Sequence, residues 1–263
     1  YVKYSGLYLI GTHASNYSLT MQGNDPSRIT PLPLNVNANS QLKLYGDADP
    51  IFTYANDPLI GDDVFSGTLD RVVGENVGTY QIQQGSLTLG PNYTISYTPN
   101  NLTIIPASLV IKPNAVVRTY GDAPLPTTLS STDFQATGLK YNETLGSITL
   151  TLPTGAGTGN EIKDTAGKYI NVVGTSDPTP GTVDLNNYQV TLLPGDIVVK
   201  KYDIIITAEP KEKRKNQIDP PFTYLVSRAL VQGDTLQGSL TRVPGEEVGF
   251  YSILQGTVYI NDN

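Results

Sequence analysis

Two short acidic runs contain the residues of this sequence best suited to bind a metal ion. Asp47 and Asp49 flank an alanine, and Asp62 and Asp63 follow a glycine. Hard cations such as Ca²⁺ bind several carboxylate and carbonyl oxygens of one loop. The Asp-Ala-Asp run does not continue into a full calcium loop, because the glycine at its sixth position and the glutamate at its twelfth are missing. We therefore expect solvated turns, with Ca²⁺ as the alternative.

Two glutamates, Glu75 and Glu246, are the candidates for acid–base catalysis. Each follows a glycine in the same short motif, and pairs of carboxylates perform glycoside hydrolysis. The two lie in different copies of that motif, however, and an arginine precedes each by four positions, Arg71 and Arg242. A salt bridge or turn contact with that arginine is the simpler interpretation. His13, the only histidine, is expected in a loop, where it is not placed for catalysis. With both glutamates paired and this histidine set aside, we predict no catalytic residue, no cofactor-binding residue and no enzyme.

Composition excludes several other classes of function. The 263 residues include no cysteine and no tryptophan, so disulfides, thiolate zinc sites and cysteine nucleophiles are ruled out. The net charge of −7 disfavours nucleic acids and anionic lipid surfaces as partners. No apolar run approaches the roughly 18 residues of a membrane-spanning helix, so we expect no membrane insertion in this stretch. The start, Tyr-Val-Lys, does not resemble a signal peptide and suggests a mature chain or a fragment.

The local patterns predict strands rather than helices. Apolar residues alternate with polar ones over short stretches, as in residues 34–39, 93–97 and 188–192. Gly, Pro, Asn or Asp interrupts these stretches every eight to twelve residues, which is typical of short antiparallel strands with one buried face. For residues 225–236 the sequence leaves two interpretations open, a short helix or a wide loop. The chain is therefore predicted to be all-β.

Internal repetition organises the whole chain. Asn-Tyr followed by alternating apolar residues begins at positions 16, 92 and 187. Several other motifs recur in the same order: Tyr45-Gly46-Asp47 with Tyr120-Gly121-Asp122, Asp49-Pro50 with Asp219-Pro220, Phe52-Thr53-Tyr54 with Phe222-Thr223-Tyr224, and Gly74-Glu75 with Gly245-Glu246. We divide the chain into the C-terminal half of a repeat (1–33), a complete repeat (34–107), a divergent repeat with an inserted loop (108–201) and the N-terminal part of a further repeat (202–263).

These motifs resemble the MBG ("mostly beta, glycine-rich") repeats of bacterial surface and adhesin proteins. The resemblance covers residues 34–107 well, 203–263 moderately and 108–201 weakly. It implies an extracellular, repetitive β-module on the bacterial cell surface, without catalytic residues. Each module is expected to be an immunoglobulin-like sandwich or β-grasp-like. Short extended junctions, such as the one at Pro106, predict modules placed end to end as an elongated rod.

Two functions follow as expectations. The first is a secreted, non-catalytic stalk of a cell-adhesion protein that projects a binding surface. The alternative is a module that binds a glycan or a surface protein of a host or neighbouring cell through the inserted loop, Gly146 to Asp164, since loops on rigid scaffolds carry recognition. The candidate ligand-binding residues are Tyr141, Thr158, Asn160 and Tyr202.

Two further expectations concern contacts at the chain's edges. The basic residues Lys211, Lys213, Arg214 and Lys215 are expected to protect an exposed strand edge from aggregation, or to touch acidic glycans or a neighbouring repeat. The two incomplete end repeats suggest strand complementation between copies, head to tail. The N-terminal segment carries strands of the kind that the C-terminal repeat lacks.

Overall fold

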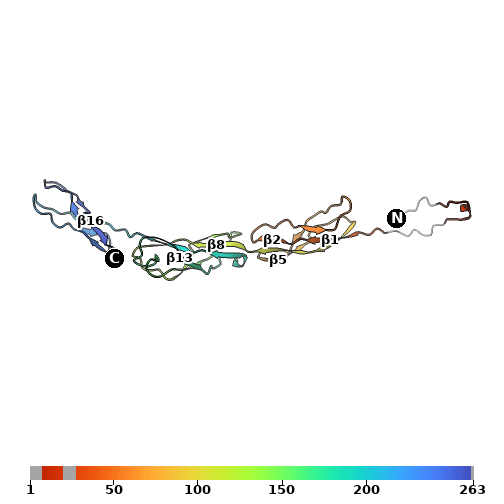
Figure 1. Ribbon diagram of the computed structural model, residues 1–263, viewed down its shortest axis with the longest axis horizontal. Coiled ribbons are helices and arrows are strands. Elements are labelled where there is room, and N and C mark those ends of the chain that lie inside the picture. The colour runs from red at the N-terminus through yellow and green to blue at the C-terminus, as the bar shows by residue number, and fades with distance from the viewer. Residues whose placement is uncertain (1–7, 20–27, 262–263) are drawn as a thin grey trace. The chain divides into compact units, whose positions relative to one another are not determined.

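The computed structural model describes residues 8–19 and 28–261, and its strands fall into two compact units, Tyr1–Ala107 and Ser108–Asn263. Figure 1 follows the chain by colour from its N-terminus to its C-terminus. The described residues contain no α-helix, only the one-turn 3₁₀ helices η1 (Ala14–Asn16) and η2 (Leu185–Asn187). The prediction of an all-β protein is confirmed. Of the predicted N-terminal half-repeat, residues 1–7 and 20–27 lie outside the described residues.

Residues 32–107 fold into two small sheets. The first has the order β3-β1-β6, formed by β3 (Tyr54–Asn56), β1 (Leu32–Ala38) and β6 (Tyr93–Thr98). The second has the order β2-β7-β5-β4, formed by β2 (Gln41–Leu44), β7 (Asn100–Ile105), β5 (Gly78–Gln83) and β4 (Asp70–Arg71). β1 runs parallel to β6, and β2 runs parallel to β7, whereas the other pairs are antiparallel.

The core of this domain comes from alternate positions on both sheets. β1 has the burial pattern expected from its alternating sequence, with Leu34 and Val36 buried and the asparagines exposed. Leu102 and Ile104 of β7 and Ile82 of β5 supply the second sheet's share, and each is at most 1% exposed. Both sheets therefore direct alternate residues into the core of this domain.

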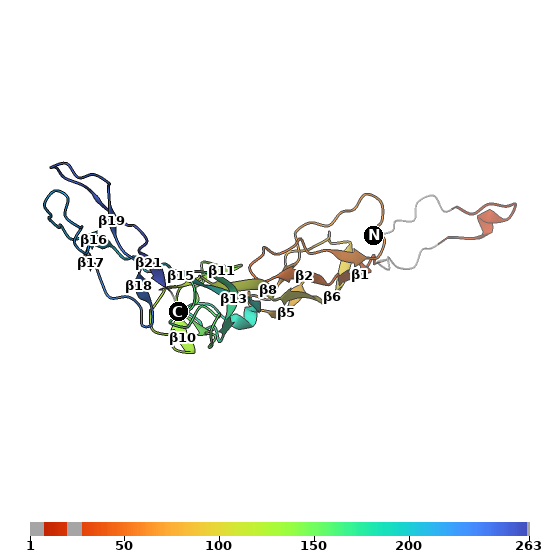
Figure 2. The same ribbon diagram turned by 60° about the vertical axis from the view of Figure 1, so that its left-hand side comes forward.

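Residues 107–200 repeat this topology with one added strand (Figure 2). The three-stranded sheet has the order β11-β8-β14, and the five-stranded sheet has the order β10-β12-β13-β15-β9. The strands are β8 (Ala107–Pro113), β9 (Val116–Thr119), β10 (Thr128–Ser131), β11 (Phe134–Thr137), β12 (Ile148–Thr151), β13 (Gly167–Ser176), β14 (Tyr188–Leu192) and β15 (Gly195–Lys200). As β7 does in the first domain, β15 lies between a parallel strand, β9, and an antiparallel one, β13.

Residues 206–261 form three short antiparallel pairs. These are β16 (Ile206–Ala208) with β17 (Tyr224–Val226), β18 (Thr235–Gln237) with β21 (Tyr259–Asn261), and β19 (Thr241–Arg242) with β20 (Ile253–Leu254). Residues 227–234 connect β17 to β18 as bends and a turn. Of the two interpretations left open for residues 225–236, the helix is therefore wrong, and β17, a loop and the start of β18 occupy the segment.

Candidate functional site

The glutamate-and-arginine motif builds the same cluster of four charges in two domains. We call Lys43, Asp49, Arg71 and Glu75 charge cluster 1, and Lys213, Asp219, Arg242 and Glu246 charge cluster 2. Cluster 2 follows cluster 1 by 170 positions (43 to 213 and 49 to 219) or 171 positions (71 to 242 and 75 to 246). The same four residue types recur with nearly the same offset, so the charge cluster belongs to the repeated unit and not to one domain alone.

In charge cluster 1, Arg71 at the end of β4 is the centre. Its Nε and Nη2 donate to the two oxygens of Asp49 at 2.6 and 3.0 Å, and Nη2 also donates to Glu75 at 2.5 Å. Its Nη1 donates to the carbonyl oxygens of Val72 and Gly74. The guanidinium therefore satisfies five hydrogen bonds and closes the turn that leads into β5.

Lys43 completes charge cluster 1 from the buried face of β2. Its ammonium lies 2.7 Å from a carboxylate oxygen of both Asp49 and Glu75. Its side chain is only 4% exposed, so it is held by its two anionic partners rather than by water. Sequence reasoning predicted the contact of Arg71 with Glu75, which is confirmed, but missed Lys43. The alternation of Leu42 and Leu44 around it predicts an exposed lysine, so no signal in the sequence indicated this role.

These contacts shift the pKa values of cluster 1 in the directions expected of ion pairs. Hydrogen bonds from Arg71 lower the pKa of Asp49 against the opposing effect of burial. Hydrogen bonds from Lys43 and Arg71 likewise lower the pKa of Glu75. Burial alone would lower the pKa of Lys43, but the two carboxylates outweigh it, and the net shift is upward. A carboxylate with a lowered pKa stays ionised and is a poor general acid at neutral pH.

An aromatic ring and a glycine hold the arginine in place. The guanidinium carbon of Arg71 lies 5.3 Å from the ring centre of Tyr80, a distance at which a cation and an aromatic face attract. Gly74 has a φ of 155°, and a Cβ atom there would lie 2.1 Å from the ring of Tyr80. The ring of Tyr80 therefore leaves room only for a glycine at position 74. The sequence alone does not show that these two residues are in contact.

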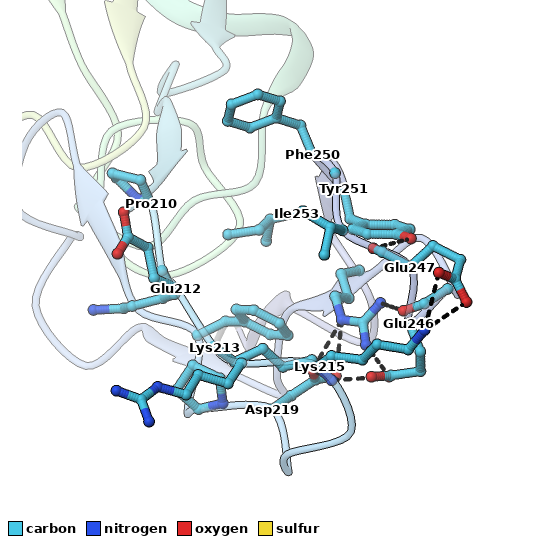
Figure 3. Close-up of a pocket in the computed structure, with 18 residues that line it drawn as sticks. Pro210, Glu212, Lys213, Lys215, Asp219, Glu246, Glu247, Phe250, Tyr251 and Ile253 are labelled. Atoms are coloured by element: carbon cyan, nitrogen blue, oxygen red, sulfur yellow. Dashed lines mark hydrogen bonds and ion pairs between the residues drawn. The ribbon is translucent and has the colours of Figure 1, made fainter.

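Charge cluster 2 repeats this geometry with different neighbours (Figure 3). Arg242 donates to both oxygens of Asp219 at 2.9 and 3.0 Å and to Glu246 at 2.8 Å, and Lys213 lies 2.8 Å from both carboxylates. The ring of Tyr251 lies 5.2 Å from the Arg242 guanidinium carbon. Three members of the predicted basic patch are thus paired with acids, since Lys215 lies 2.9 Å from Glu247 and Lys211 lies 4.0 Å from Glu209.

The middle domain replaces this cluster with one arginine. Arg118 of β9 stands at the position that Lys43 has on β2, and its guanidinium donates to the carbonyl oxygens of Gly159, Glu161 and Asp122. Within the described residues its Nε is the one buried side-chain nitrogen or oxygen without a hydrogen-bond partner. The inserted loop has therefore taken the place of the missing aspartate and glutamate.

The predicted ligand residues of the inserted loop mostly face inward. Asn160 is 1% exposed, and its amide donates to the carbonyl oxygens of Leu125 and Pro153. Thr158 is half-buried and donates its hydroxyl to Gly155 at 2.7 Å. Tyr141 is 56% exposed on a separate turn. Tyr202 donates to the Ala229 carbonyl oxygen, and its ring is covered by Arg228, whose guanidinium carbon lies 3.8 Å from the ring centre.

The tyrosine of the Asn-Tyr motif fastens a turn in both complete domains. The Tyr93 hydroxyl accepts from the backbone nitrogen of Ile60 at 3.1 Å and donates to Asp63 at 2.7 Å. The Tyr188 hydroxyl accepts from the backbone nitrogen of Lys140 at 2.8 Å and donates to Glu143. Burial and the bond to Glu143 raise the pKa of Tyr188 to about 12.

The four aspartates proposed as calcium ligands are placed in different roles. Asp49 belongs to charge cluster 1, and Asp63 accepts the Tyr93 hydroxyl. The Asp47 backbone nitrogen closes the Tyr-Gly-Asp turn by donating to Leu44, and Asp62 is exposed on the turn that holds Asp63. Over residues 8–19 and 28–261, no three acidic, histidine or cysteine side chains come together as a metal site.

Comparison with known families gives one match. The MBG domain of the YGX type matches residues 34–103 and 204–263. Comparisons with curated proteins and with solved structures gave no match. None of the described helices has the length and apolar character needed to cross a membrane. The family's YGX signature is Tyr45-Gly46-Asp47 in the first matched segment. Residues 34–103 and 204–263 of this chain are therefore MBG domains of the YGX type.

Proposed function

We propose that this chain is a structural, non-catalytic region of a bacterial cell-surface adhesin, built of tandem β-repeats that project or present a binding surface outside the cell. The observation that supports it best is that the charged side chains of the repeated motif are paired with one another. The carboxylates and cations of both charge clusters are engaged with one another and with turn carbonyl groups, where they fix the fold of each domain. The match to MBG domains supports the same proposal.

Short connections between domains also support a stalk. A single residue, Pro106, separates β7 from β8 in the sequence. Proline fixes φ and favours an extended approach of the residue before it, so this connection has few conformations available. A region that projects a binding surface needs such stiff junctions, because a flexible linker would let the surface fall back.

Small-angle X-ray scattering of the 263-residue chain tests the stalk. We expect a distance distribution with an early maximum and a long tail, as a rod of end-to-end domains gives. A variant with a Gly-Ser-Gly-Ser insertion after Pro106 serves as the control and should shorten that tail. A symmetric distribution, unchanged by the insertion, would contradict the proposal.

The alternative, ligand binding by the inserted loop, is tested separately. The tip from Gly155 to Gly157 is exposed, whereas Asn160 and Asp164 behind it are buried and bind the loop's own backbone. If the chain binds a glycan or a cell-surface protein, and the binding is lost when this tip is changed, the result favours the alternative. Ala156→Glu changes the exposed tip, leaves those buried contacts intact and is the matched change.

A further inference from the structure

The connection between the middle domain and the C-terminal MBG domain has no proline of the kind found at Pro106. Five residues, 201–205, connect β15 to β16, and none of them is proline. A connection of this length has many conformations available unless contacts hold it. Both domains belong to the same compact unit, Ser108–Asn263, and side chains of the two meet at this junction.

Asp234 of the C-terminal domain is at the centre of this contact. It directly precedes β18, in a turn that its backbone nitrogen closes by donating to the carbonyl oxygen of Val231 at 3.0 Å. Its side chain is only 4% exposed. The Tyr120 hydroxyl donates to one carboxylate oxygen at 2.9 Å, and the Lys163 ammonium donates to the other. Both of these donors belong to the middle domain, so a carboxylate of one domain is buried against the other.

The inserted loop of the middle domain places the lysine of this contact. The nitrogen of Gly121 donates to the carbonyl oxygen of Ile162 at 3.1 Å, and Arg118 binds two further carbonyl groups of the same loop. These bonds hold the loop beside the Tyr-Gly-Asp turn, where the Lys163 ammonium lies 5.9 Å from the ring centre of Tyr120. The arginine that replaces the charge cluster in this domain therefore also determines where Lys163 lies.

The glycine of the Tyr-Gly-Asp turn permits the close approach of the C-terminal domain. Gly121 has a φ of 88°, and a Cβ atom there would lie 2.3 Å from a methyl carbon of Val231. A side chain at this position would therefore push the two domains apart. Two residues of the turn, Tyr120 and Gly121, thus contact the domain that follows.

The three domains differ at the position of Asp234. The repeated Gly-Asp motif aligns Asp234 with Asp62 of the first domain. The turn contacts of the two Asn-Tyr tyrosines align Asp62 with Asn142 of the middle domain. Asparagine carries no charge and would leave the ammonium of Lys163 without an anion. The contact therefore discriminates between repeats by the residue that each carries at this position.

We propose that the Tyr-Gly-Asp turn and the inserted loop of the middle domain form a docking surface whose partner is the Gly-Asp turn of a following MBG repeat. The inserted loop recognises another repeat of its own chain, and Lys163 selects a repeat with aspartate at the position of Asp234. A second copy of the middle repeat, which has Asn142 there, does not fit this surface. The proposal deepens the stalk function and rests on it for its biological use, since docking stiffens a junction without proline.

Distances between two spin labels on the 263-residue chain test the proposal. The chain has no cysteine, so the introduced cysteines Gln189→Cys in the middle domain and Thr207→Cys in the C-terminal domain are the only labelled sites. Both positions are exposed on strands. Two changes are made in this labelled chain. Lys163→Glu places a like charge against Asp234, and Asp234→Asn introduces the residue of the middle repeat.

We expect one narrow distance distribution in the labelled parent chain. In Lys163→Glu the population outside that peak should rise about tenfold or more, because a buried carboxylate loses its cation. The rise should be smaller in Asp234→Asn, which keeps an acceptor for the Tyr120 hydroxyl. Lys168→Met is the matched control and should leave the peak narrow, since this lysine pairs at 2.9 Å with Asp196 of its own domain.

A broad distribution in the parent chain, or a narrow one in both Lys163→Glu and Asp234→Asn, would overturn the proposal. Circular dichroism checks that the strand content is the same in all variants. The stalk proposal fails separately. A rod-like scattering profile with a broad label distribution would overturn the docking surface alone, whereas a compact profile with a narrow label distribution would contradict the stalk alone.

Discussion

Replacing Arg71 with methionine tests whether charge cluster 1 stabilises its domain. Arg71→Met keeps an apolar stem near the Tyr80 ring but removes all five hydrogen bonds of the guanidinium. Removing one partner of a buried ion pair costs about 3–5 kcal/mol. Here Asp49 and Glu75 are 33% and 51% exposed and keep Lys43 as a partner, so water and that lysine recover part of the loss. We expect the free energy of opening to fall by about 2–3 kcal/mol.

Hydrogen exchange at a buried amide of the same domain is the appropriate assay, because a chain of several domains does not unfold in one step. The Ile82 amide of β5 lies in the core and reports on the domain that contains cluster 1. Arg71→Lys is the conservative control, which keeps the charge but not the planar fork and should lose less.

Arg242→Met in the second MBG domain is the matched change. Its cluster is more open than the first, since Arg242 and Lys213 have side chains 13% and 19% exposed against 8% and 4% for Arg71 and Lys43. We therefore expect a smaller loss, confined to its own domain. The reasoning is refuted if Arg71→Met leaves exchange at Ile82 unchanged, or if Arg242→Met is the more damaging of the two.

Four further outcomes follow from the contacts. The pKa values of Asp49 and Glu75 are lower in the folded protein than in the unfolded chain, so their ion pairs add stability above the unfolded pKa values and lose it as pH falls through the folded ones. Acid unfolding followed by circular dichroism should therefore begin below about pH 4, and the loss of stability with pH should be shallower in Asp49→Asn. The pKa of Tyr188 near 12 gives stability that is present below its ordinary value of 10.0 and lost as pH rises toward 12. Absorbance at 295 nm should therefore show a titration step near pH 12 that Tyr188→Phe removes, and a step of unchanged size in that variant would contradict the assignment. Asn160→Ala should destabilise the middle domain by about 1–3 kcal/mol in denaturant titration, because buried carbonyl groups lose their donor, and an unchanged midpoint would contradict the buried role. Gly74→Ala should lower the melting temperature of the first MBG domain, since its Cβ would meet the tyrosine ring of β5, whereas the same change at the open Gly90 should not.

Local order along the chain was predictable from the sequence. The alternation in residues 34–39 predicted which side chains of β1 are buried, since a strand directs successive residues to opposite faces. The recurrence of Gly74-Glu75 as Gly245-Glu246 predicted that both glutamates do the same thing, and the ion pairs with Arg71 and Arg242 confirm the interpretation given to them. These features depend on neighbours within a few residues, so the sequence holds them directly.

The partners of the clusters required the tertiary structure. Lys43 and Glu75 are 32 positions apart in the sequence, and they meet in the folded domain, where β7 pairs with both β2 and β5. The same is true of Asn160, which the sequence offered as a ligand residue on an exposed loop. The structure turns it inward to bond with Leu125, because buried backbone groups there need partners.

The sequence by itself determined the repeat, its all-β character and the residue types that each copy places at its turns, because alternation and turn chemistry are local. Only the tertiary structure decided which charges neutralise one another. Strand pairing joins segments far apart along the chain, and the sequence carries no local signal of the partner that a strand will find.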